Sequence, residues 1–575
     1  MLTAIEIENF KAFGDRQRIE LAPLTLLFGP NSGGKSSIIH ALHYAREIML
    51  GRGCDVHRTE SGADLVDLGG FVNFFHQGSD STRQGGVLRL LFEMNDSSGA
   101  GEILEAWSNH GMDVESELTS DPLNVEGLRD LGLSQKAIDI LESKKITFGI
   151  DIKRAVDENV GASLQEAAPY ISGYYIACDG EAVAIRECSE ITHTLSVRSD
   201  FFERSDLPAS VSDDGQWITF RESRIRMFSD RTRLPLHWDK EIIDPSHLWD
   251  ILDGDALVLD DEKELALRMT LSHWLTRLFI GPGAILAKTL ESFRYIGPLR
   301  SIPPRTNSGT SPVGPSQWPS GLAAWKCLVD DYDPQRGDPN LIEPVSQALF
   351  DREKLDTGYR LQLAEHVTVE SGKFLEILRK VRMMDSDEDF DERIDLPSSK
   401  QLVLTDDRGQ DHLPHDVGVG LSQVIPVLVA CLDWGPMISI EQPELHLHPK
   451  QQAALGDFLI QAIRPTVTTQ LAEGELEEFI DADHWSRQEH RNVIIETHSA
   501  HMILRILRRI RETSTQDYAP KDCALRAQDL SVLYVQPNPN TGASEVKRML
   551  VDVHGEFVDP WPDSFFDQDS EERFN

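Results

Sequence analysis

The segment Leu24–Ser37, LTLLFGPNSGGKSS, constrains the fold of this chain more than any other stretch. Residues 29–36 match the pattern G-x-x-x-x-G-K-[ST], in which glycines let backbone N–H groups surround phosphate oxygens. The apolar residues before it predict a strand over 24–28, and the apolar spacing after it predicts a helix over about 36–50. Because strand, loop and helix follow in this order, a chance glycine-rich turn is disfavoured and a phosphate-binding loop is predicted.

Each residue type in this loop has an expected role toward ATP and Mg²⁺. Lys35 is expected to reach the β and γ phosphates, and the Ser36 hydroxyl is expected to bind Mg²⁺. The other residues predicted to bind the nucleotide in this loop are Asn31, Gly33, Gly34 and Ser37.

Composition indicates a soluble globular protein of several domains. At 575 residues the chain is long enough for three or four domains, and 40% of its residues are hydrophobic while 26% are charged. No stretch reaches the roughly 18 apolar residues that a membrane span needs, and the first ten residues resemble a strand and lack the pattern of a secretory signal. A cytoplasmic location is therefore expected.

Charge and cysteine usage disfavour two classes of function. The formal net charge of −39 opposes unaided binding to a nucleic acid, since phosphate contacts need clustered Lys and Arg, although solubility alone also accounts for the acidity. The six cysteines form no C-x-x-C pair, which argues against a zinc site or a disulfide framework.

The middle of the chain predicts a different architecture from the two ends. Short strand-like segments between 146 and 198 indicate an antiparallel sheet, and Glu262–Leu278 has the apolar spacing of an amphipathic helix. The segment Tyr295–Arg305 is basic and punctuated by prolines, which is typical of a loop near phosphate or of a linker.

Two buried strands late in the sequence end in chemically active residues. Met437–Glu441 is an apolar run that ends in an acid, as a P-loop enzyme requires to hold the hydration shell of Mg²⁺. A second apolar run begins at Asn492 and leads to His498. A lone histidine is more often structural, but this one follows a strand in the order expected of a nucleotide switch.

Together these segments resemble the ABC-type ATPase heads of the SMC, RecF and overcoming-lysogenization-defect group. The resemblance implies an α/β P-loop NTPase with a mixed sheet, an antiparallel β subdomain and a largely helical insertion. It implies an N-terminal head part over 1–110, a β and helical insertion over 111–290, and a C-terminal head part over 291–575. The family's motifs correspond in order to Gly29–Ser37, Gln77, Gly418–Gln423, Met437–Glu441 and His498.

The resemblance also implies roles for single residues and for a second subunit. Gln77 would be the Q-loop residue beside the metal, and Lys11 matches a basic residue that such heads place near the nucleotide. In a head-to-head dimer, the Ser422 hydroxyl of one subunit, at the start of a helix, would close on the γ-phosphate of the other.

Two departures from the family pattern are visible. The signature segment over 418–423 reads GVGLSQ where the family usually has Leu-Ser-Gly-Gly, a departure shared with a defence-associated subset that has endings similar to Gly555–Phe557 and Trp561–Phe566. Gln442 stands where the family places a catalytic glutamate, and glutamine cannot accept a proton from the attacking water. Slow hydrolysis is one expectation, and restored turnover through Glu444 or His498 is the other.

The resemblance leads to one expected function and two alternatives. The first is the ATPase subunit of a prokaryotic defence complex of Septu type, which dimerises on ATP and controls a separate nuclease, with any DNA contact indirect. No nuclease is expected in residues 499–575, because they show no Asp-x-Asp after a strand. The alternatives are a DNA-repair or chromosome-maintenance ATPase that acts on DNA directly, and a scaffold whose ATP is structural.

Overall fold

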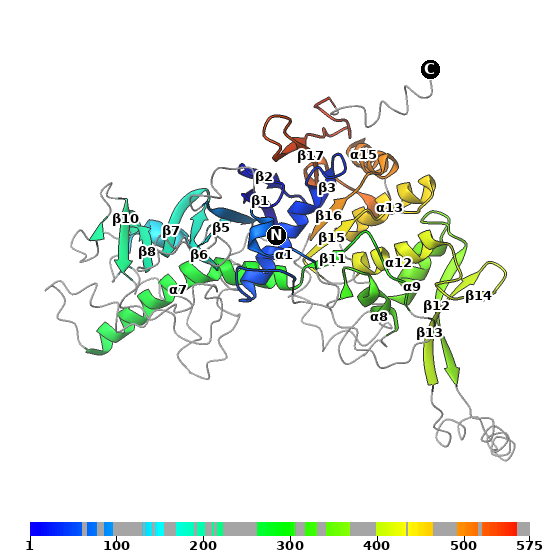
Figure 1. Ribbon diagram of the computed structural model, residues 1–575, viewed down its shortest axis with the longest axis horizontal. Helices are drawn as coiled ribbons and strands as arrows, with labels where there is room; N and C mark the ends of the chain where they lie inside the picture. Colours follow the sequence, from blue (N-terminus) through cyan, green and yellow to red (C-terminus); the bar gives the residue numbers. More distant parts are fainter. Residues whose placement is uncertain are drawn as a thin grey trace, which may run out of the picture.

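The computed structural model contains two large sheets and a smaller hairpin sheet (Figure 1). It describes residues 1–59, 66–76, 86–95, 129, 133–140, 143, 145–154, 168–188, 193–201, 210–211, 216–221, 261–303, 305, 317–329, 341–367, 398–432, 435–463, 491–515 and 520–560. Within these ranges, every helix is too short or too polar to cross a membrane.

A six-stranded sheet at the centre of the molecule carries the P-loop. Its first five strands run parallel, and the last pairs antiparallel at the edge. In spatial order they are β11 (Arg294–Ile296), β15 (Met437–Glu441), β16 (Asn492–Glu496), β3 (Leu24–Phe28), β17 (Leu530–Pro537) and β18 (Ser544–Met549).

The three central strands of this sheet are mainly apolar, as expected where both faces of a sheet are covered. Every residue of β3, β15 and β16 is buried. In β16, Val493 and Ile495 pack into one core and Ile494 packs into the other. The predicted strand over 24–28 is confirmed, as is the P-loop ATPase fold.

A nine-stranded antiparallel sheet lies beside the first. It confirms the predicted antiparallel subdomain, and its strands over 145–198 lie within two residues of the expected ones. In spatial order they are β2 (Gln17–Glu20), β1 (Leu2–Glu8), β4 (Leu88–Asn95), β5 (Lys145–Arg154), β6 (Pro169–Cys178), β7 (Glu181–Cys188), β8 (His193–Arg198), β10 (Trp217–Arg221) and β9 (Ser210–Val211).

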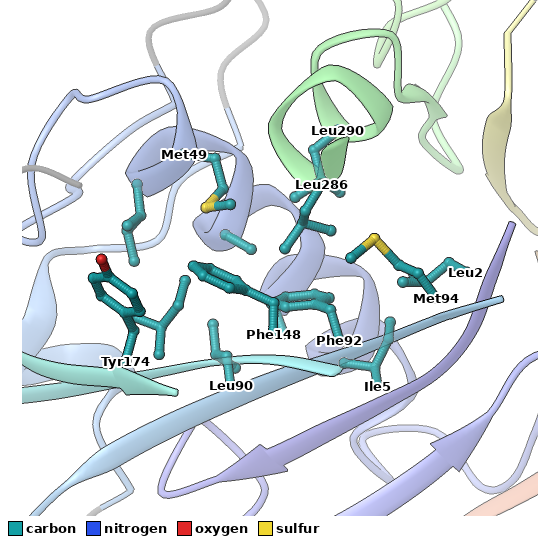
Figure 2. Close-up of a cluster of buried hydrophobic side chains, with 14 of the residues drawn as sticks. Leu2, Ile5, Met49, Leu90, Phe92, Met94, Phe148, Tyr174, Leu286 and Leu290 are labelled. Atoms are coloured by element: carbon teal, nitrogen blue, oxygen red, sulfur yellow. The ribbon is translucent and has the colours of Figure 1, made fainter. Parts of the chain in front are cut away.

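Helix α1 (Lys35–Met49) lies between the two sheets, and 12 of its 15 residues are buried. A helix that is buried on nearly every side needs apolar neighbours all round. Figure 2 shows one part of this core, where Phe92 and Phe148 from the antiparallel sheet meet Met49 of α1 and Leu286 of α7 (Asp261–Glu291). The core therefore fixes the helix that follows the P-loop.

Helices cover the other face of the parallel sheet (Figure 1). Helix α13 begins with Pro449 at its first position, and the His448 side chain accepts a hydrogen bond from the Lys450 backbone, so the HP pair of the sequence is a helix start. The helices and the hairpin sheet on this side are α8 (Leu322–Val329), α9 (Ile342–Phe350), α12 (Val419–Leu432), α13 (Pro449–Ala462), α15 (Ala500–Thr515), β12 (Tyr359–Val367), β13 (Ser398–Asp406) and β14 (Asp411–His412).

The predicted β and helical insertion over 111–290 contains both strands and helices where it is described. Strands β5 to β10 extend the antiparallel sheet that β1, β2 and β4 begin, and β4 pairs directly with β5. Its described helices are the short α5 (Gln135–Asp139) and the long α7, which extends the predicted helix over 262–278 to residue 291. The predicted boundary after residue 110 lies outside the described residues and stays a prediction.

Candidate nucleotide and metal site

The glycines of the P-loop are required by close contacts with the two C-terminal strands. Gly29 has φ of +137°, and a Cβ there would lie 1.9 Å from the carbonyl oxygen of Val535 on β17. Gly34 has φ of +99°, and a Cβ there would lie 2.6 Å from Ser544 Oγ. The loop can therefore fold against β17 and β18 only without side chains at these positions.

Lys35 is buried and bound to its own loop. Its Nζ donates to the carbonyl oxygens of Gly29 and Pro30, at 3.1 and 3.0 Å. The Lys35 side chain is 4% exposed, and this burial lowers the pKa of its amine. The amine thus lies at the mouth of the predicted phosphate cradle, with backbone oxygens as its partners.

The other predicted residues of the loop differ in their surroundings. Asn31 is exposed, and Gly33 accepts a hydrogen bond from Ser544 Oγ at 2.8 Å. Ser37 is buried in the first turn of α1, where its backbone N–H donates to Gly34. Their roles toward phosphate stay predictions.

Ser36 contacts a residue that sequence analysis did not single out. Its hydroxyl donates to Glu496 Oε2 at 2.9 Å, and Lys35 Nζ lies 3.7 Å from Glu496 Oε1. Glu496 ends β16 and is buried. The two functional residues of the P-loop thus share one carboxylate.

Glu441 ends the neighbouring strand, β15, and is 7% exposed. Its Oε1 accepts a hydrogen bond from the Tyr295 hydroxyl at 2.9 Å. Burial, followed by the negative charge of Glu496, raises the pKa of Glu441 to about 7. Glu441 is therefore near half-protonation at neutral pH, and a cation close by would favour its charged form.

Arg300 holds the backbone around the end of β15. Its guanidinium donates to the carbonyl oxygens of Glu441 and Gln442, at 2.6 and 3.2 Å, and to the carbonyl oxygen of Gln423 on α12 at 3.3 Å. Burial lowers its pKa to about 10. The segment over 295–305, predicted as a loop near phosphate or a linker, thus connects the Glu441 turn to α12.

Gln442 begins the turn after β15 and is partly buried. Its φ of +45° is in the left-handed region, which is uncommon for a residue with a side chain and is often found at functional sites. Its backbone N–H donates to the carbonyl oxygen of Glu496 at 2.7 Å. An amide side chain at this position carries no charge and cannot serve as a base.

Glu444 turns into the protein from the same loop. Its Oε1 accepts a hydrogen bond from the backbone N–H of His498 at 2.7 Å, and its side chain is buried. Burial raises the pKa of this carboxyl. The structure therefore places the Glu444 carboxylate against the backbone of His498, and a catalytic role for either residue in place of Gln442 stays a prediction.

His498 follows β16 and is partly buried. Burial, and then the charge of Lys35, lower the pKa of its imidazole, so the ring is neutral at pH 7. Its Nε2 is a buried atom with no hydrogen-bond partner among the described residues. A neutral imidazole nitrogen without a partner fits a role toward an incoming phosphate or water.

Lys11 contacts the helix that follows the P-loop. Its Nζ is 2.7 Å from Nδ1 of His40, which is one helical turn beyond Ser36. Burial lowers the pKa of the Lys11 amine, and the pKa of His40 falls to about 3. The expected contact of Lys11 with a nucleotide stays a prediction.

Ser422 is expected to offer its hydroxyl to the γ-phosphate bound by a second subunit, but in the structure of this chain the residue is buried. Helix α12 begins at Val419, so Ser422 lies within the first turn, fully buried, and its hydroxyl donates to the carbonyl oxygen of Pro414 at 2.5 Å. The residue exposed at this helix end is Val419. Gly420 allows the helix to pack on the turn after β15, since a Cβ there would lie 2.4 Å from His446 O.

Gln77, the predicted Q-loop residue and metal ligand, lies outside the described residues. Sequence analysis did not identify Tyr295, Arg300 or Glu496 as site residues. For Glu496 a signal existed, because β15 and β16 are both apolar runs that end in glutamate. For Tyr295 and Arg300, contacts that span more than 120 residues of sequence leave no local pattern.

The residues at this site fit a nucleotide with its divalent cation. The hydroxyl of Ser36 and the carboxylates of Glu441 and Glu496 are oxygen donors, the type that Mg²⁺ prefers. The glycine loop packs closely on β17 and β18, and α1 begins directly after it, so the helix N-terminus faces the loop. A bound Mg²⁺ would neutralise charge on the β and γ phosphates.

Two family models match parts of the chain. Residues 4–146 match a model described as "AAA domain", and residues 340–503 match one described as "AAA domain, putative AbiEii toxin, Type IV TA system". The chromosome partition protein Smc of Gloeobacter violaceus is 36% identical over 103 residues, which span 18% of this chain and 8% of that protein. These matches support an ATPase of the SMC and ABC type.

Solved structures of SMC heads align along most of the chain at low similarity. The SMC head bound to the C-winged helix domain of ScpA is 10% identical, with a TM-score of 0.37, covering 96% of this chain and 98% of that one. The head domain from Thermotoga maritima is 10% identical, with a TM-score of 0.32 and coverages of 96% and 99%.

Proposed function

We propose that this chain is an ATP-binding ATPase head that hydrolyses ATP slowly, dimerises on ATP and controls a separate effector, a nuclease, in antiviral defence. Slow hydrolysis is inferred from the residues in the turn after β15. Gln442 follows the acid of this strand, and the carboxylate of Glu444 is already engaged by the His498 backbone. A slow ATPase is suited to act as a switch, because each nucleotide state persists long enough to hold or release a partner.

The steady-state rate of ATP hydrolysis by the purified chain tests whether hydrolysis is slow. Typical enzymes turn over between about 1 and 1,000 times per second, and we expect the wild type below about 0.1 per second. Gln442→Glu is expected to raise turnover at least about tenfold, since it supplies a base beside the attacking water. A wild-type rate of several per second that Glu444→Ala abolishes and Gln442→Ala preserves would overturn slow hydrolysis.

Dimerisation is tested by light scattering with and without a non-hydrolysable ATP analogue. The mass is expected to double with the analogue in the wild type and to stay monomeric in Lys35→Ala, which lacks the amine that reaches the phosphates. An oligomer whose mass ignores both nucleotide and the substitution would favour the structural scaffold.

The control of a separate effector is supported by one family match and by the net charge. The model that matches residues 340–503 names a toxin system, which fits a defence role for this chain. The net charge of −39 favours a protein partner over direct binding to DNA. A nuclease gene beside this one, whose product co-purifies with the wild type, would support the proposal, and phage resistance that survives Lys35→Ala would contradict it.

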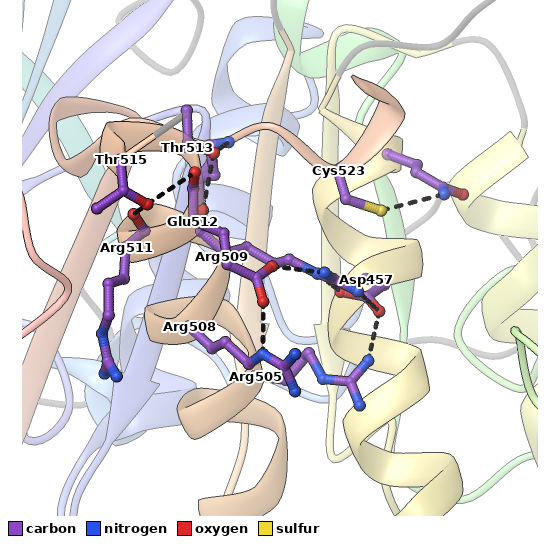
Figure 3. A network of polar contacts seen from close by, with 11 residues as sticks. Asp457, Arg505, Arg508, Arg509, Arg511, Glu512, Thr513, Thr515 and Cys523 are labelled. Atoms are coloured by element: carbon purple, nitrogen blue, oxygen red, sulfur yellow. Dashed lines mark hydrogen bonds and ion pairs between the residues drawn. The ribbon is translucent and has the colours of Figure 1, made fainter. Parts of the chain in front are cut away.

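The Smc match favours a second candidate, a chromosome-maintenance or DNA-repair ATPase that acts on DNA directly. Helix α15 carries the arginines on which such binding could depend, but several are already paired. Figure 3 shows Arg505 and Arg509 on Asp457, and Arg508 on Glu512. These pairs leave less positive charge for phosphate.

Binding of a 40-base-pair duplex at 50 and 200 mM salt distinguishes the two candidates. An effector-controlling ATPase is expected to bind with a Kd above about 100 μM at 200 mM salt, weaker than usual non-specific binders. A Kd near 1 μM that ATP tightens and salt weakens would favour the second candidate.

A further inference from the structure

Two glutamates end adjacent parallel strands beside the P-loop. Glu441 of β15 and Glu496 of β16 are direct neighbours in the strand register. Their exposed fractions are 7% and 6%, so both carboxylates are buried. A pair of buried acids side by side is costly unless a cation or a proton compensates.

Of the two, Glu496 is the one that touches the P-loop. Its Oε2 accepts the Ser36 hydroxyl at 2.9 Å and its Oε1 lies 3.7 Å from Lys35 Nζ. Glu441 is held instead by the Tyr295 hydroxyl. Ser36, which is expected to bind the cation, therefore has Glu496 as its carboxylate partner.

One lysine contacts the pair of carboxylates, and one arginine lies near it. Lys35 is the cation that contacts Glu496, while the Arg300 guanidinium is bound to backbone oxygens rather than to either carboxylate. Phosphate groups of ATP would add further negative charge.

A buried hydroxyl nearby also has no partner. Ser439 lies two residues before Glu441 on β15, and side chains two apart share one face of a strand. It is fully buried, and its Oγ has no hydrogen-bond partner among the described residues. An unpartnered buried hydroxyl therefore lies on the same face of β15 as Glu441.

We infer that Glu496 is a second carboxylate of the divalent-cation site, and that with Glu441 it makes the cation a strict requirement for ATP binding. Without the cation, the two carboxylates repel the phosphates; with it, they hold the cation or its waters. The described residues contain no cluster of three or more His, Cys, Asp or Glu that could bind a metal alone, so phosphate oxygens and water complete the shell. This inference rests on the proposed ATP binding.

The test compares the wild type with Glu496→Gln, which keeps an oxygen acceptor for Ser36 but removes the charge. Affinity for a fluorescent ATP analogue is measured in Mg²⁺ and in EDTA, and Mn²⁺ affinity is measured by electron paramagnetic resonance with and without the analogue. Glu545→Gln, at an exposed position of β18, is the matched control.

We expect Glu496→Gln to bind the analogue in EDTA at least about tenfold tighter than the wild type, and to bind Mn²⁺ at least about tenfold weaker, the size of effect known for supporting ligands of metal sites. Glu545→Gln is expected to match the wild type in both. Affinities within twofold of the wild type for Glu496→Gln would overturn the inference and leave Glu496 as a hydrogen-bond partner of Ser36.

Two further measurements keep the inference testable. If Glu496→Gln fails to fold, a crystal structure of the wild type with Mn²⁺ and the analogue shows whether Glu496 lies at the cation. Mn²⁺ should lie about 2 Å from a Glu496 oxygen, or about 4 Å if one water intervenes, and a greater distance overturns the inference. Failure of the wild type to bind the analogue with Mg²⁺ overturns the proposed function, whereas Mn²⁺ titrated without nucleotide still tests Glu496.

Discussion

The carboxylate of Glu444 accepts a hydrogen bond from the backbone N–H of His498 at 2.7 Å, which connects the turn after β15 to the end of β16. Glu444 is buried and His498 is partly buried, so breaking this bond leaves a largely shielded donor unpaired. The contact joins the two loops that carry Gln442 and His498. Its strength therefore bears on how firmly both candidate catalytic residues are held.

Glu444→Ala is expected to lower the free energy of unfolding by about 1–3 kcal/mol, because the His498 N–H loses its acceptor. Glu444→Gln should lower it by less than about 1 kcal/mol, since the amide oxygen can still accept. Urea unfolding followed by circular dichroism measures both. Equal stability of Glu444→Ala and the wild type would show that the contact contributes nothing.

Arg300→Ala is expected to lower the free energy of unfolding by about 2–4 kcal/mol, because three backbone carbonyls lose a buried charged donor. Arg300→Lys should recover only part of this, since an ammonium cannot reproduce the planar fork of the guanidinium. The control is Arg305→Ala, which breaks a solvent-exposed pair with Asp416 and should cost less than about 1 kcal/mol. Similar losses for Arg300→Ala and Arg305→Ala would contradict the role of Arg300.

Gly29→Ala is expected to abolish ATP binding, because its Cβ would overlap the Val535 carbonyl oxygen and displace the P-loop from β17. Gly409→Ala is the control: its φ of +76° is also left-handed, but a Cβ there meets nothing within 4 Å. Gly409→Ala should lower the free energy of unfolding by about 1–2 kcal/mol through backbone strain alone. Its affinity for ATP should equal that of the wild type. Calorimetric titration with ATP compares them, and normal affinity in Gly29→Ala would disprove the close contact.

The parallel sheet and the P-loop could be predicted because two-sided burial leaves a local pattern. The strands Leu24–Phe28 and Met437–Glu441 are mainly apolar and fully buried, and their ends mark the site. The orientation of Ser422 could not be predicted from its motif, since it depends on α12 beginning three residues earlier and on contact with Pro414. The contact of Glu496 with Ser36 depends on the register that places β16 beside both β15 and β3, which no local sequence pattern encodes.

Stability is expected to fall in mild acid because His40 is held neutral. Burial, and secondarily the charge of Lys11, lowers the His40 pKa to about 3, whereas the unfolded chain has a pKa of about 6.5. Below pH 6.5 the unfolded state therefore binds more protons than the folded state. The free energy of unfolding consequently decreases as the pH falls from about 6.5 toward 3.

His40→Asn removes this titration while keeping an oxygen acceptor for the Lys11 amine. Between pH 7 and pH 5 the wild type should lose about 1–2 kcal/mol more stability than the variant, given a difference of several pH units between the two pKa values and the partial exposure of the ring. Urea unfolding at half-unit pH steps measures the two slopes. Since other groups titrate equally in both proteins, parallel slopes would show that His40 is protonated in the folded state.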